Sequence, residues 1–140
     1  MKFEEIFESN DNVRIVYEEY RGGNLRERLA KATLNRVDFR EATEVAYRIL
    51  RGVEHMHEQG IAHLNIHPET IRFKDEKDYG FDCGLFEVGH SATAETIAAG
   101  GLAMSGILGF CAPELMNPND QEKPGLHSDI FSIGSLMFTM

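Results

Sequence analysis

The sequence predicts an α+β fold that is mainly α-helical, and three observations predict it. A β-branched and aromatic run at residues 13–17 is typical of a strand, and residues 40–59 repeat apolar side chains at helical spacing. Residues 130–140 are almost wholly apolar, as in a helix buried all round. The 140 residues, 42% hydrophobic and 26% charged, suffice for one globular domain with a real core.

Charge and cysteine content narrow the classes of function. Because 14 Lys+Arg stand against 23 Asp+Glu, we expect no nucleic-acid partner, which needs clustered basic residues. No apolar run is long enough to cross a bilayer and no signal peptide opens the chain, so we expect no membrane association. Cys83 and Cys111 fit neither a disulfide framework nor a C-x-x-C motif, which predicts a reduced protein in the cytoplasm.

The negative charge is concentrated in the C-terminal half of the chain. Residues 61–140 carry four basic and eleven acidic side chains. A protein partner of this half is therefore expected to be basic. A solvated acidic face without a partner is the simpler interpretation of the same charges.

The N-terminal segments predict a strand followed by a short helix. Residues 13–17 form the strand, and Gly22-Gly23 ends the extended segment that follows it. Asn24 is a helix N-cap, and Glu27 three positions later completes a capping box. We therefore expect a helix over residues 25–32.

The strongest periodic signal predicts a long helix over residues 40–59. Seven apolar residues there follow the spacing of one helical face: Ala42, Val45, Ala46, Ile49, Leu50, Val53 and Met56. Gly60 ends this helix in the manner of a C′ glycine.

The later segments predict smaller elements. Residues 70–73 and 79–81 are expected to pair as a hairpin around a turn at 74–78. Residues 83–111 lack periodicity and predict a long loop. Residues 112–116 predict one helical turn, and Ser128 is expected to cap a final helix that begins near Asp129.

The order of these segments resembles the protein kinase family. Residues 15–25 match the strand and hinge beside the adenine pocket, and residues 63–70 match the catalytic loop H-R-D-x-K-P-E-N. Asp82-Cys83-Gly84 matches D-F-G, and Ala112-Pro113-Glu114 matches A-P-E. Residues 128–134 match the start of the central helix. The resemblance implies a partial kinase domain over residues 1–140, incomplete at both ends. Residues 1–23 would be the end of the small lobe with the hinge, and residues 24–140 the first part of the α-helical large lobe.

The resemblance also implies roles for single residues. Glu18 and Tyr20 of the hinge would lie beside the adenine of ATP, and Asp82 would be a Mg²⁺ ligand. His63 would pack beneath the metal-binding loop, with Gly84 in the glycine position of that loop.

Two further residues match structural positions of the family. Asp129 resembles the buried Asp that bonds the amides of the catalytic loop. Glu114 stands where the family has a Glu that pairs with a distant Arg, and that Arg has no counterpart here, so the role of Glu114 stays open.

The catalytic loop departs from the family at three positions. Asn65 stands at the place of the Asp that accepts the substrate proton, and an amide is not a base near pH 7. His67 replaces the Lys that balances charge on the transferred phosphate, and Thr70 replaces a metal-binding Asn. No G-x-G-x-x-G loop occurs in the chain, so binding of ATP and Mg²⁺ is expected to be weak or absent.

These departures predict a pseudokinase of the Ser/Thr type that acts in signalling by binding or scaffolding. Two alternatives stay open: a fragment of an ATP-binding Ser/Thr protein kinase that phosphorylates proteins, and a truncated gene product without function. His67-Pro68 also resembles the loop of small-molecule kinases, but Ala112-Pro113-Glu114 and Ser128-Asp129 belong to the protein kinases. His63 and His67 are close enough to share a metal, yet no third ligand is evident.

Overall fold

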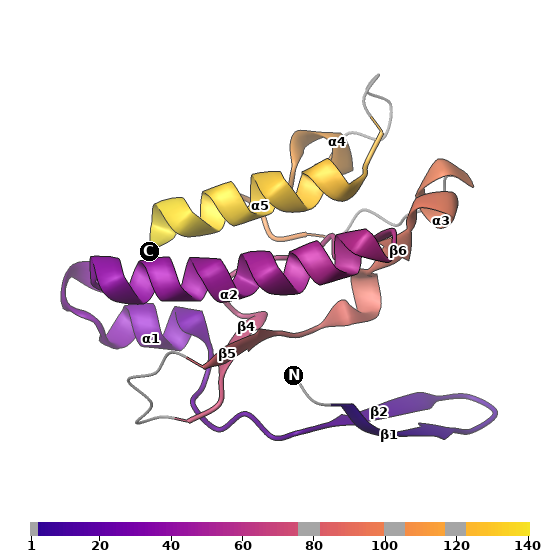
Figure 1. The fold of residues 1–140 in the computed structure, drawn as a ribbon, viewed down its shortest axis with the longest axis horizontal. Helices are drawn as coiled ribbons and strands as arrows, with labels where there is room; N and C mark the ends of the chain where they lie inside the picture. Colours follow the sequence, from indigo (N-terminus) through magenta and orange to yellow (C-terminus); the bar gives the residue numbers. More distant parts are fainter. Residues whose placement is uncertain (1–2, 76–81, 100–105, 117–122) are drawn as a thin grey trace.

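The computed structural model describes residues 3–75, 82–99, 106–116 and 123–140, and it has the α+β fold that the sequence predicts (Figure 1). The strands are β1 (Phe3–Glu8), β2 (Val13–Tyr17), β3 (Ile61–Ala62), β4 (Ile71–Phe73), β5 (Cys83–Leu85) and β6 (Ala92–Thr93). The helices are α1 (Leu25–Lys31), α2 (Phe39–Glu58), α3 (Ala94–Ala99), α4 (Pro113–Met116) and α5 (Leu126–Thr139), with 3₁₀ turns η1 (Thr33–Asn35) and η2 (Val88–His90). In these ranges the strands form three two-stranded sheets, β1 with β2, β3 with β6 and β4 with β5.

Strands β1 and β2 form an antiparallel hairpin that projects from the helical body (Figure 1). Strand β2 confirms the prediction for residues 13–17, whereas the sequence analysis missed β1. All six residues of β1 are exposed, and its register is irregular between Phe3 and Glu5. A strand without one buried face lacks the alternating pattern by which a strand is recognised in a sequence.

Helices α1 and α2 begin at the side-chain caps that their local sequences favour. The Asn24 Oδ1 accepts the Glu27 N–H at 2.9 Å and the Glu27 carboxylate accepts the Asn24 N–H at 3.3 Å, which confirms the predicted capping box. In α2, the Asp38 side chain accepts the Glu41 N–H at 2.8 Å. Gly60 ends α2 with φ +70°, a left-handed conformation that glycine adopts without steric cost.

The hydrophobic core lies on both sides of α2, which contacts α5 on one side and β5 on the other. The main cluster comprises Leu25, Val45, Ala46, Ile49, Val53, Ile66, Ile71, Phe73, Ile133, Leu136 and Met140. A second cluster comprises Ala62, Leu64, Ala92, Ile97, Cys111, Ala112 and Leu115. The catalytic loop runs between the two clusters, since it supplies Leu64 to one and Ile66 to the other. Packing therefore fixes the first half of this loop.

The β4 strand pairs with a segment beyond the one that the sequence analysis chose. Its partner is β5, with Ile71 opposite Leu85 and Phe73 opposite Cys83. The predicted partner at residues 79–81 lies outside the described residues. The long loop predicted for residues 83–111 is wrong in part, because β5, η2, β6 and α3 all fall in it. Strands of two or three residues depend on distant partners and leave no local pattern.

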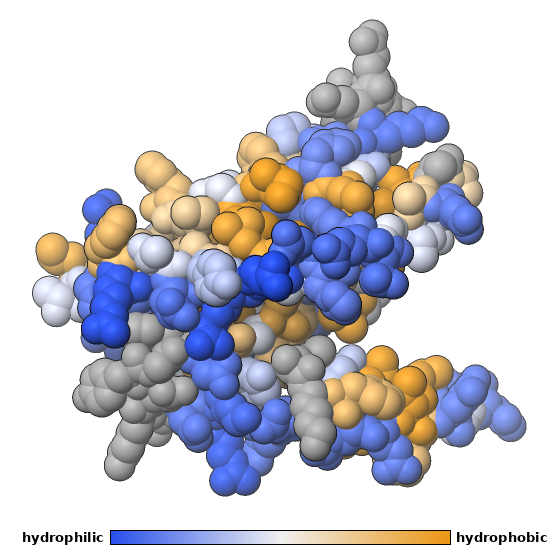
Figure 2. Space-filling model, in the orientation of Figure 1, coloured by the Kyte–Doolittle hydropathy of each residue, from blue (hydrophilic) through white to orange (hydrophobic). Residues whose placement is uncertain are grey.

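Helix α5 differs from its prediction in two respects. It begins at Leu126 with Gly125 at the N-cap, and Ser128 lies inside the first turn, where its Oγ accepts the Gly125 N–H at 3.1 Å. It is also not buried all round: Phe131 is 45% exposed and Phe138 92% exposed. Apolar side chains are accordingly visible on the molecular surface (Figure 2). No helix in the described ranges has the length and apolar character needed to cross a membrane.

Candidate functional site

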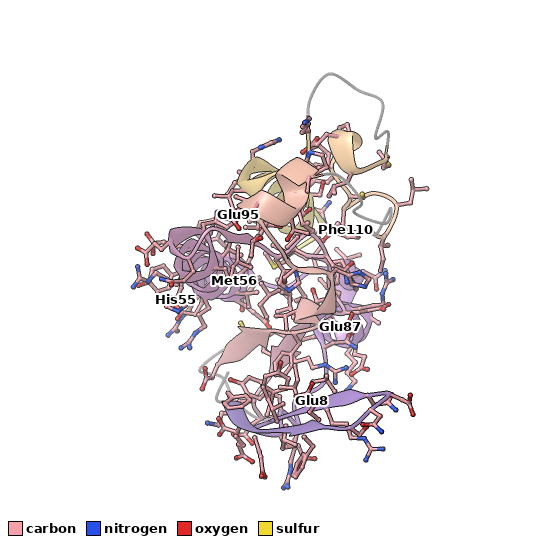
Figure 3. The ribbon with its side chains drawn as sticks, turned by 90° about the vertical axis from the view of Figure 1, so that its right-hand side faces the viewer. Glu8, His55, Met56, Glu87, Glu95 and Phe110 are labelled. Atoms are coloured by element: carbon pink, nitrogen blue, oxygen red, sulfur yellow. The ribbon has the colours of Figure 1, made fainter. Side chains whose placement is uncertain are left out.

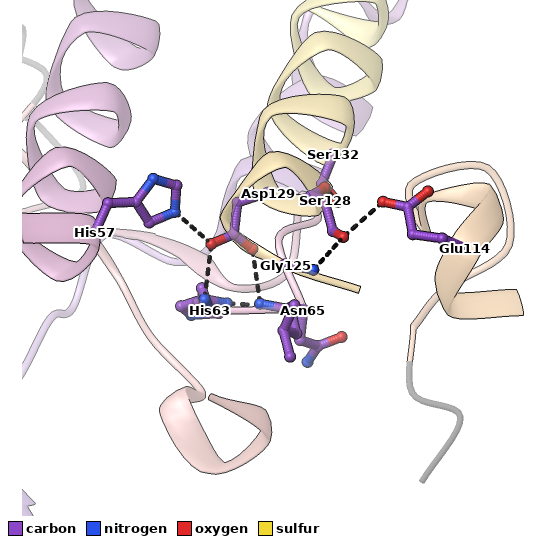
Figure 4. A network of polar contacts seen from close by, with 9 residues as sticks. His57, His63, Asn65, Glu114, Gly125, Ser128, Asp129 and Ser132 are labelled. Atoms are coloured by element: carbon purple, nitrogen blue, oxygen red, sulfur yellow. Dashed lines mark hydrogen bonds and ion pairs between the residues drawn. The ribbon is translucent and has the colours of Figure 1, made fainter. Parts of the chain in front are cut away.

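One buried carboxylate, that of Asp129 at the start of α5, holds the catalytic loop (Figure 4). Its two oxygens accept the backbone N–H groups of His63 and Leu64, each at 2.7 Å. Its Oδ2 also lies 2.9 Å from Nε2 of His57 in α2. Leu64 has φ +63°, which is unfavourable for a residue with a Cβ. The hydrogen bonds to Asp129 offset this strain.

His63 links the catalytic loop to the segment after β5. Its Nδ1 accepts the Asn65 N–H at 3.3 Å, so its Nε2 carries the hydrogen and donates to the Phe86 carbonyl at 3.0 Å. The ring is fully buried. Burial lowers the pKa of His63 below its usual value, and the nearby Asp129 carboxylate opposes this only partly. The imidazole is therefore neutral in the folded protein at neutral pH.

This buried neutral histidine predicts a loss of stability in acid. The unfolded chain takes up a proton at position 63 near pH 6.5, whereas the folded chain does so only at lower pH, so the unfolded state binds more protons in between. We expect His63→Gln to reduce the slope of unfolding free energy against pH by up to about 1.4 kcal/mol per pH unit below about pH 6.5. Urea titrations over this range measure it. The exposed His55→Gln is the matched control, and equal slopes for His63→Gln and wild type would contradict the prediction.

Asn65, His67 and Thr70 lie together in this buried loop, at 8%, 3% and 0% exposure. Thr70 Oγ1 accepts the His67 N–H at 3.1 Å and donates to the His67 carbonyl at 2.8 Å, so its proton is already used. The His67 Nδ1 accepts the Glu69 N–H at 3.3 Å, which leaves the hydrogen on Nε2. Burial lowers the pKa of His67, against the charges of Glu87 and Glu69. The loop thus offers an amide, a hydroxyl and a neutral imidazole.

The hinge residues Glu18 and Tyr20 contact residues next to the β4–β5 pair. The Glu18 carboxylate pairs with the Lys74 ammonium at 2.7 Å. The Tyr20 ring meets Phe86 edge to face at 4.9 Å between centroids. A Cβ on Gly84 would lie 3.3 Å from the Tyr20 ring, so a larger residue would need this ring to shift by a few tenths of an ångström. Burial raises the pKa of the Tyr20 phenol, so it stays protonated.

Comparisons with known proteins agree with this arrangement. The family model described as Protein kinase domain matches residues 1–140. The chain belongs to the protein kinase family. It is 28% identical to ribosomal protein S6 kinase 2 beta of Xenopus laevis, over 97% of this chain and 21% of that protein. It is 32% identical to smooth muscle myosin light chain kinase of Gallus gallus, over 97% of this chain and 7% of that protein.

A calcium/calmodulin-dependent protein kinase of Metarhizium anisopliae is 28% identical over the whole chain and 35% of its own length. The chain thus spans well under two thirds of each of these kinases. The family and the α+β kinase-like fold are established by these matches, and the shared region is the one that holds the hinge and the catalytic loop.

Two acid-x-glycine triplets lie at β5 in this kinase-like site: Asp82-Cys83-Gly84 runs into the strand and Glu87-Val88-Gly89 follows it. Asp82 precedes the strand, and its carboxylate pairs with the Arg48 guanidinium of α2 at 2.9 Å. Glu87 follows the strand with φ +63°, and its charge acts on His67 of the catalytic loop. Sequence reasoning missed Glu87, although Glu87-Val88-Gly89 repeats the pattern of Asp82-Cys83-Gly84 five residues later. The pairing of β4 with β5 brings the second triplet, Glu87-Val88-Gly89, next to the catalytic loop. The sequence alone does not show this pairing.

The described residues do not fit the Mg²⁺ site of a protein kinase. The Thr70 hydroxyl is engaged by the His67 backbone and the Asp82 carboxylate by Arg48. Over the described ranges, no group of three or more His, Cys, Asp or Glu side chains is placed to hold a metal ion. The metal role of Asp82 therefore stays a prediction.

Glu114 of the A-P-E motif has partners within this chain. It is 7% exposed and accepts the Ser128 hydroxyl at 2.6 Å (Figure 4). It also lies 3.4 Å from Nε2 of His127. The pair with Ser128 joins α4 to the first turn of α5, where Asp129 also holds the catalytic loop. The sequence did not suggest this partner because residues 114 and 128 approach each other only through the fold.

Proposed function

We propose that this chain is a catalytically impaired protein kinase domain that acts by binding another protein. The observation that carries the proposal is the catalytic loop: its backbone is held by Asp129, yet Asn65 stands where the family has its proton acceptor. A positioned general base contributes about 10²- to 10⁴-fold to such reactions. A carboxamide contributes none of it.

The other loop residues support the same proposal. A neutral His67 cannot balance charge on a transferred phosphate as a Lys does, and the Thr70 hydroxyl is bonded to backbone. Binding of ATP and Mg²⁺ would then be weak or absent. The eleven acidic and four basic side chains of residues 61–140 favour a basic partner protein, and we place this role in cytoplasmic signalling.

Restoring the carboxylate tests the proposal. We expect a cooperative thermal transition whose midpoint temperature does not rise with Mg·ATP. We also expect neither the wild type nor Asn65→Asp to phosphorylate a peptide mixture. The variant stays inactive because the Lys and metal positions are altered as well. Radiolabelled phosphate on a peptide, present with wild type and lost in Asn65→Ala, would contradict the proposal.

The relatives favour a second function. Each is named as a kinase, so the chain is alternatively a fragment of an ATP-binding Ser/Thr protein kinase that phosphorylates proteins. A rise in melting temperature with Mg·ATP would support this alternative. The absence of any cooperative transition would instead point to a truncated product without function.

A further inference from the structure

The outer sides of α2 and α5 form one surface, which we call the α2–α5 face. The two helices lie side by side and run antiparallel (Figure 1). A groove of about 680 Å³ lies between them, and Tyr47 and Leu50 of α2 and Ile130 of α5 line it. These three side chains are each at least 42% exposed. Figure 2 shows apolar side chains over these helices. The α2–α5 face is therefore an apolar groove that is open to solvent.

Helix α5 adds an exposed apolar stripe that is symmetric about Gly134. Ile130 and Phe131 lie four and three residues before Gly134, and Met137 and Phe138 lie three and four residues after it. All four of these side chains are exposed. A Cβ on Gly134 would have no neighbour within 4 Å, so the stripe is open at its centre. Residues three and four apart are neighbours on a helix, so the stripe presents the same pattern when the helix is reversed.

Charged side chains on α2 match a reversed copy at the same level. Nε2 of His57 in α2 lies 2.9 Å from Oδ2 of Asp129 in α5. Because each helix rises about 1.5 Å per residue, Gly134, five residues after Asp129, lies level with the point five residues before His57. Arg51 and Glu54 stand on either side of that point, and both line the groove. A two-fold axis in the face at this level, perpendicular to both helices, sets Arg51 of each copy against Glu54 of the other.

The size and charge of the α2–α5 face also fit a second copy. Helices of 20 and 14 residues, about 30 and 21 Å long and packed about 10 Å apart, present roughly 500 Å². Two copies would then bury roughly 1,000 Å², the lower limit of a specific interface. No side chain from Ile130 to Met140 is charged, so burial of the stripe desolvates no charge. A basic partner would gain nothing from this stripe.

We propose that the α2–α5 face binds a second copy of this chain, with α2 against α2 and α5 against α5 in antiparallel pairs. Met137 packs against the partner's Phe131 beside Gly134, and Arg51 pairs with the partner's Glu54. Within one copy Arg51 and Glu54 also pair, but their side chains are 65% and 54% exposed, so exchanging this contact for one between copies costs little. The inference goes beyond the proposed function and does not depend on whether the chain transfers phosphate.

Analytical ultracentrifugation of the full chain tests the dimer. We expect a dissociation constant on the order of 10 μM, because interfaces near the lower size limit are weak. Met137→Glu should weaken the dimer at least about tenfold, since each copy then buries a carboxylate in an apolar contact. Ile6→Glu is the matched control and should leave the dissociation constant unchanged, because its side chain is similarly exposed at 53% against 50% for Met137. Figure 3 shows the hairpin that carries Ile6, marked by Glu8, apart from α2, marked by Met56.

A mixing experiment tests the pairing of charges between copies. Arg51→Glu alone and Glu54→Arg alone should each weaken self-association at least about tenfold, because like charges then meet across the axis. An equimolar mixture of the two variants should associate to within about threefold of the wild type, because each acidic pair then faces a basic pair. The contact within each copy is the same in the pure and the mixed samples, so recovery on mixing reports only the contact between copies.

Each other outcome decides against the inference. A wild-type chain that is monomeric at about 100 μM, with the amide NMR spectrum of a folded protein, overturns it and means that another segment or protein covers the face. Equal effects of Met137→Glu and Ile6→Glu overturn it, and so does a mixture that associates no better than its components. Growth beyond two copies also overturns it, because two-fold pairing is closed. The proposed function fails separately, through phosphate transfer to a peptide, which sedimentation does not measure.

Discussion

Asp129→Ala is expected to lower the free energy of unfolding by about 3–5 kcal/mol, a large part of the roughly 5–15 kcal/mol of a typical domain. The side chain is fully buried, and its removal leaves the backbone N–H groups of His63 and Leu64 without an acceptor. Each unsatisfied buried donor costs about 1–3 kcal/mol. The left-handed Leu64 also loses what holds it, so the amides of the catalytic loop should exchange faster with solvent.

Urea unfolding with amide exchange measures both effects. Asp82→Ala is the matched control. The Asp82 side chain is 42% exposed and its partner Arg48 is 35% exposed, so this ion pair should contribute less than about 1 kcal/mol to the unfolding free energy. Asp129→Asn keeps one acceptor oxygen and should fall between the two. A loss below about 1 kcal/mol in Asp129→Ala, or unchanged exchange at positions 63 and 64, would show that the carboxylate does not support the loop.

Helices whose signals are local could be predicted from the sequence. The capping box of Asn24 and Glu27 and the apolar face of α2 depend on residues within a few positions of one another. The start of α5 was misplaced by three residues, since Ser128 has the composition of an N-cap but serves as the partner of Glu114 and Gly125. A serine that could cap a helix can therefore instead donate its hydroxyl to a buried carboxylate, and the local sequence does not distinguish the two.

The candidate site was predictable in its residue types and not in its contacts. Asn65, His67 and Thr70 show from the sequence alone which functional groups the loop carries, because an amide, an imidazole and a hydroxyl have fixed properties. The pairing of Arg48 with Asp82 and the approach of Glu87 to the loop depend on the register of β4 and β5, which tertiary packing sets. The placement of β5, which begins at Cys83, therefore decides which of the two similar triplets lies next to the loop.

Phe73→Ala is expected to cost about 3–5 kcal/mol of unfolding free energy. Phe73 is 1% exposed in the main core, and the Arg28 guanidinium covers its ring at 3.7 Å from the centroid. The backbone of Phe73 bonds Gly22 and Gly23 of the hinge at 2.9 and 3.0 Å. A Cβ on Gly22 would lie 2.8 Å from that of Phe73, so the hinge is closely fitted to this strand. Truncating the ring leaves a cavity beneath the hinge and the end of β4.

The same change at an exposed phenylalanine isolates the packing contribution. Phe138 is 92% exposed on α5, so Phe138→Ala should change the unfolding free energy by less than about 0.5 kcal/mol. Phe73→Leu keeps much of the volume and should lose less than Phe73→Ala. Equal losses in Phe73→Ala and Phe138→Ala, by urea unfolding, would mean that the interior between α1 and β4 is not packed as described. In that case the packed core around Phe73 would not hold the hinge and the catalytic loop in fixed positions.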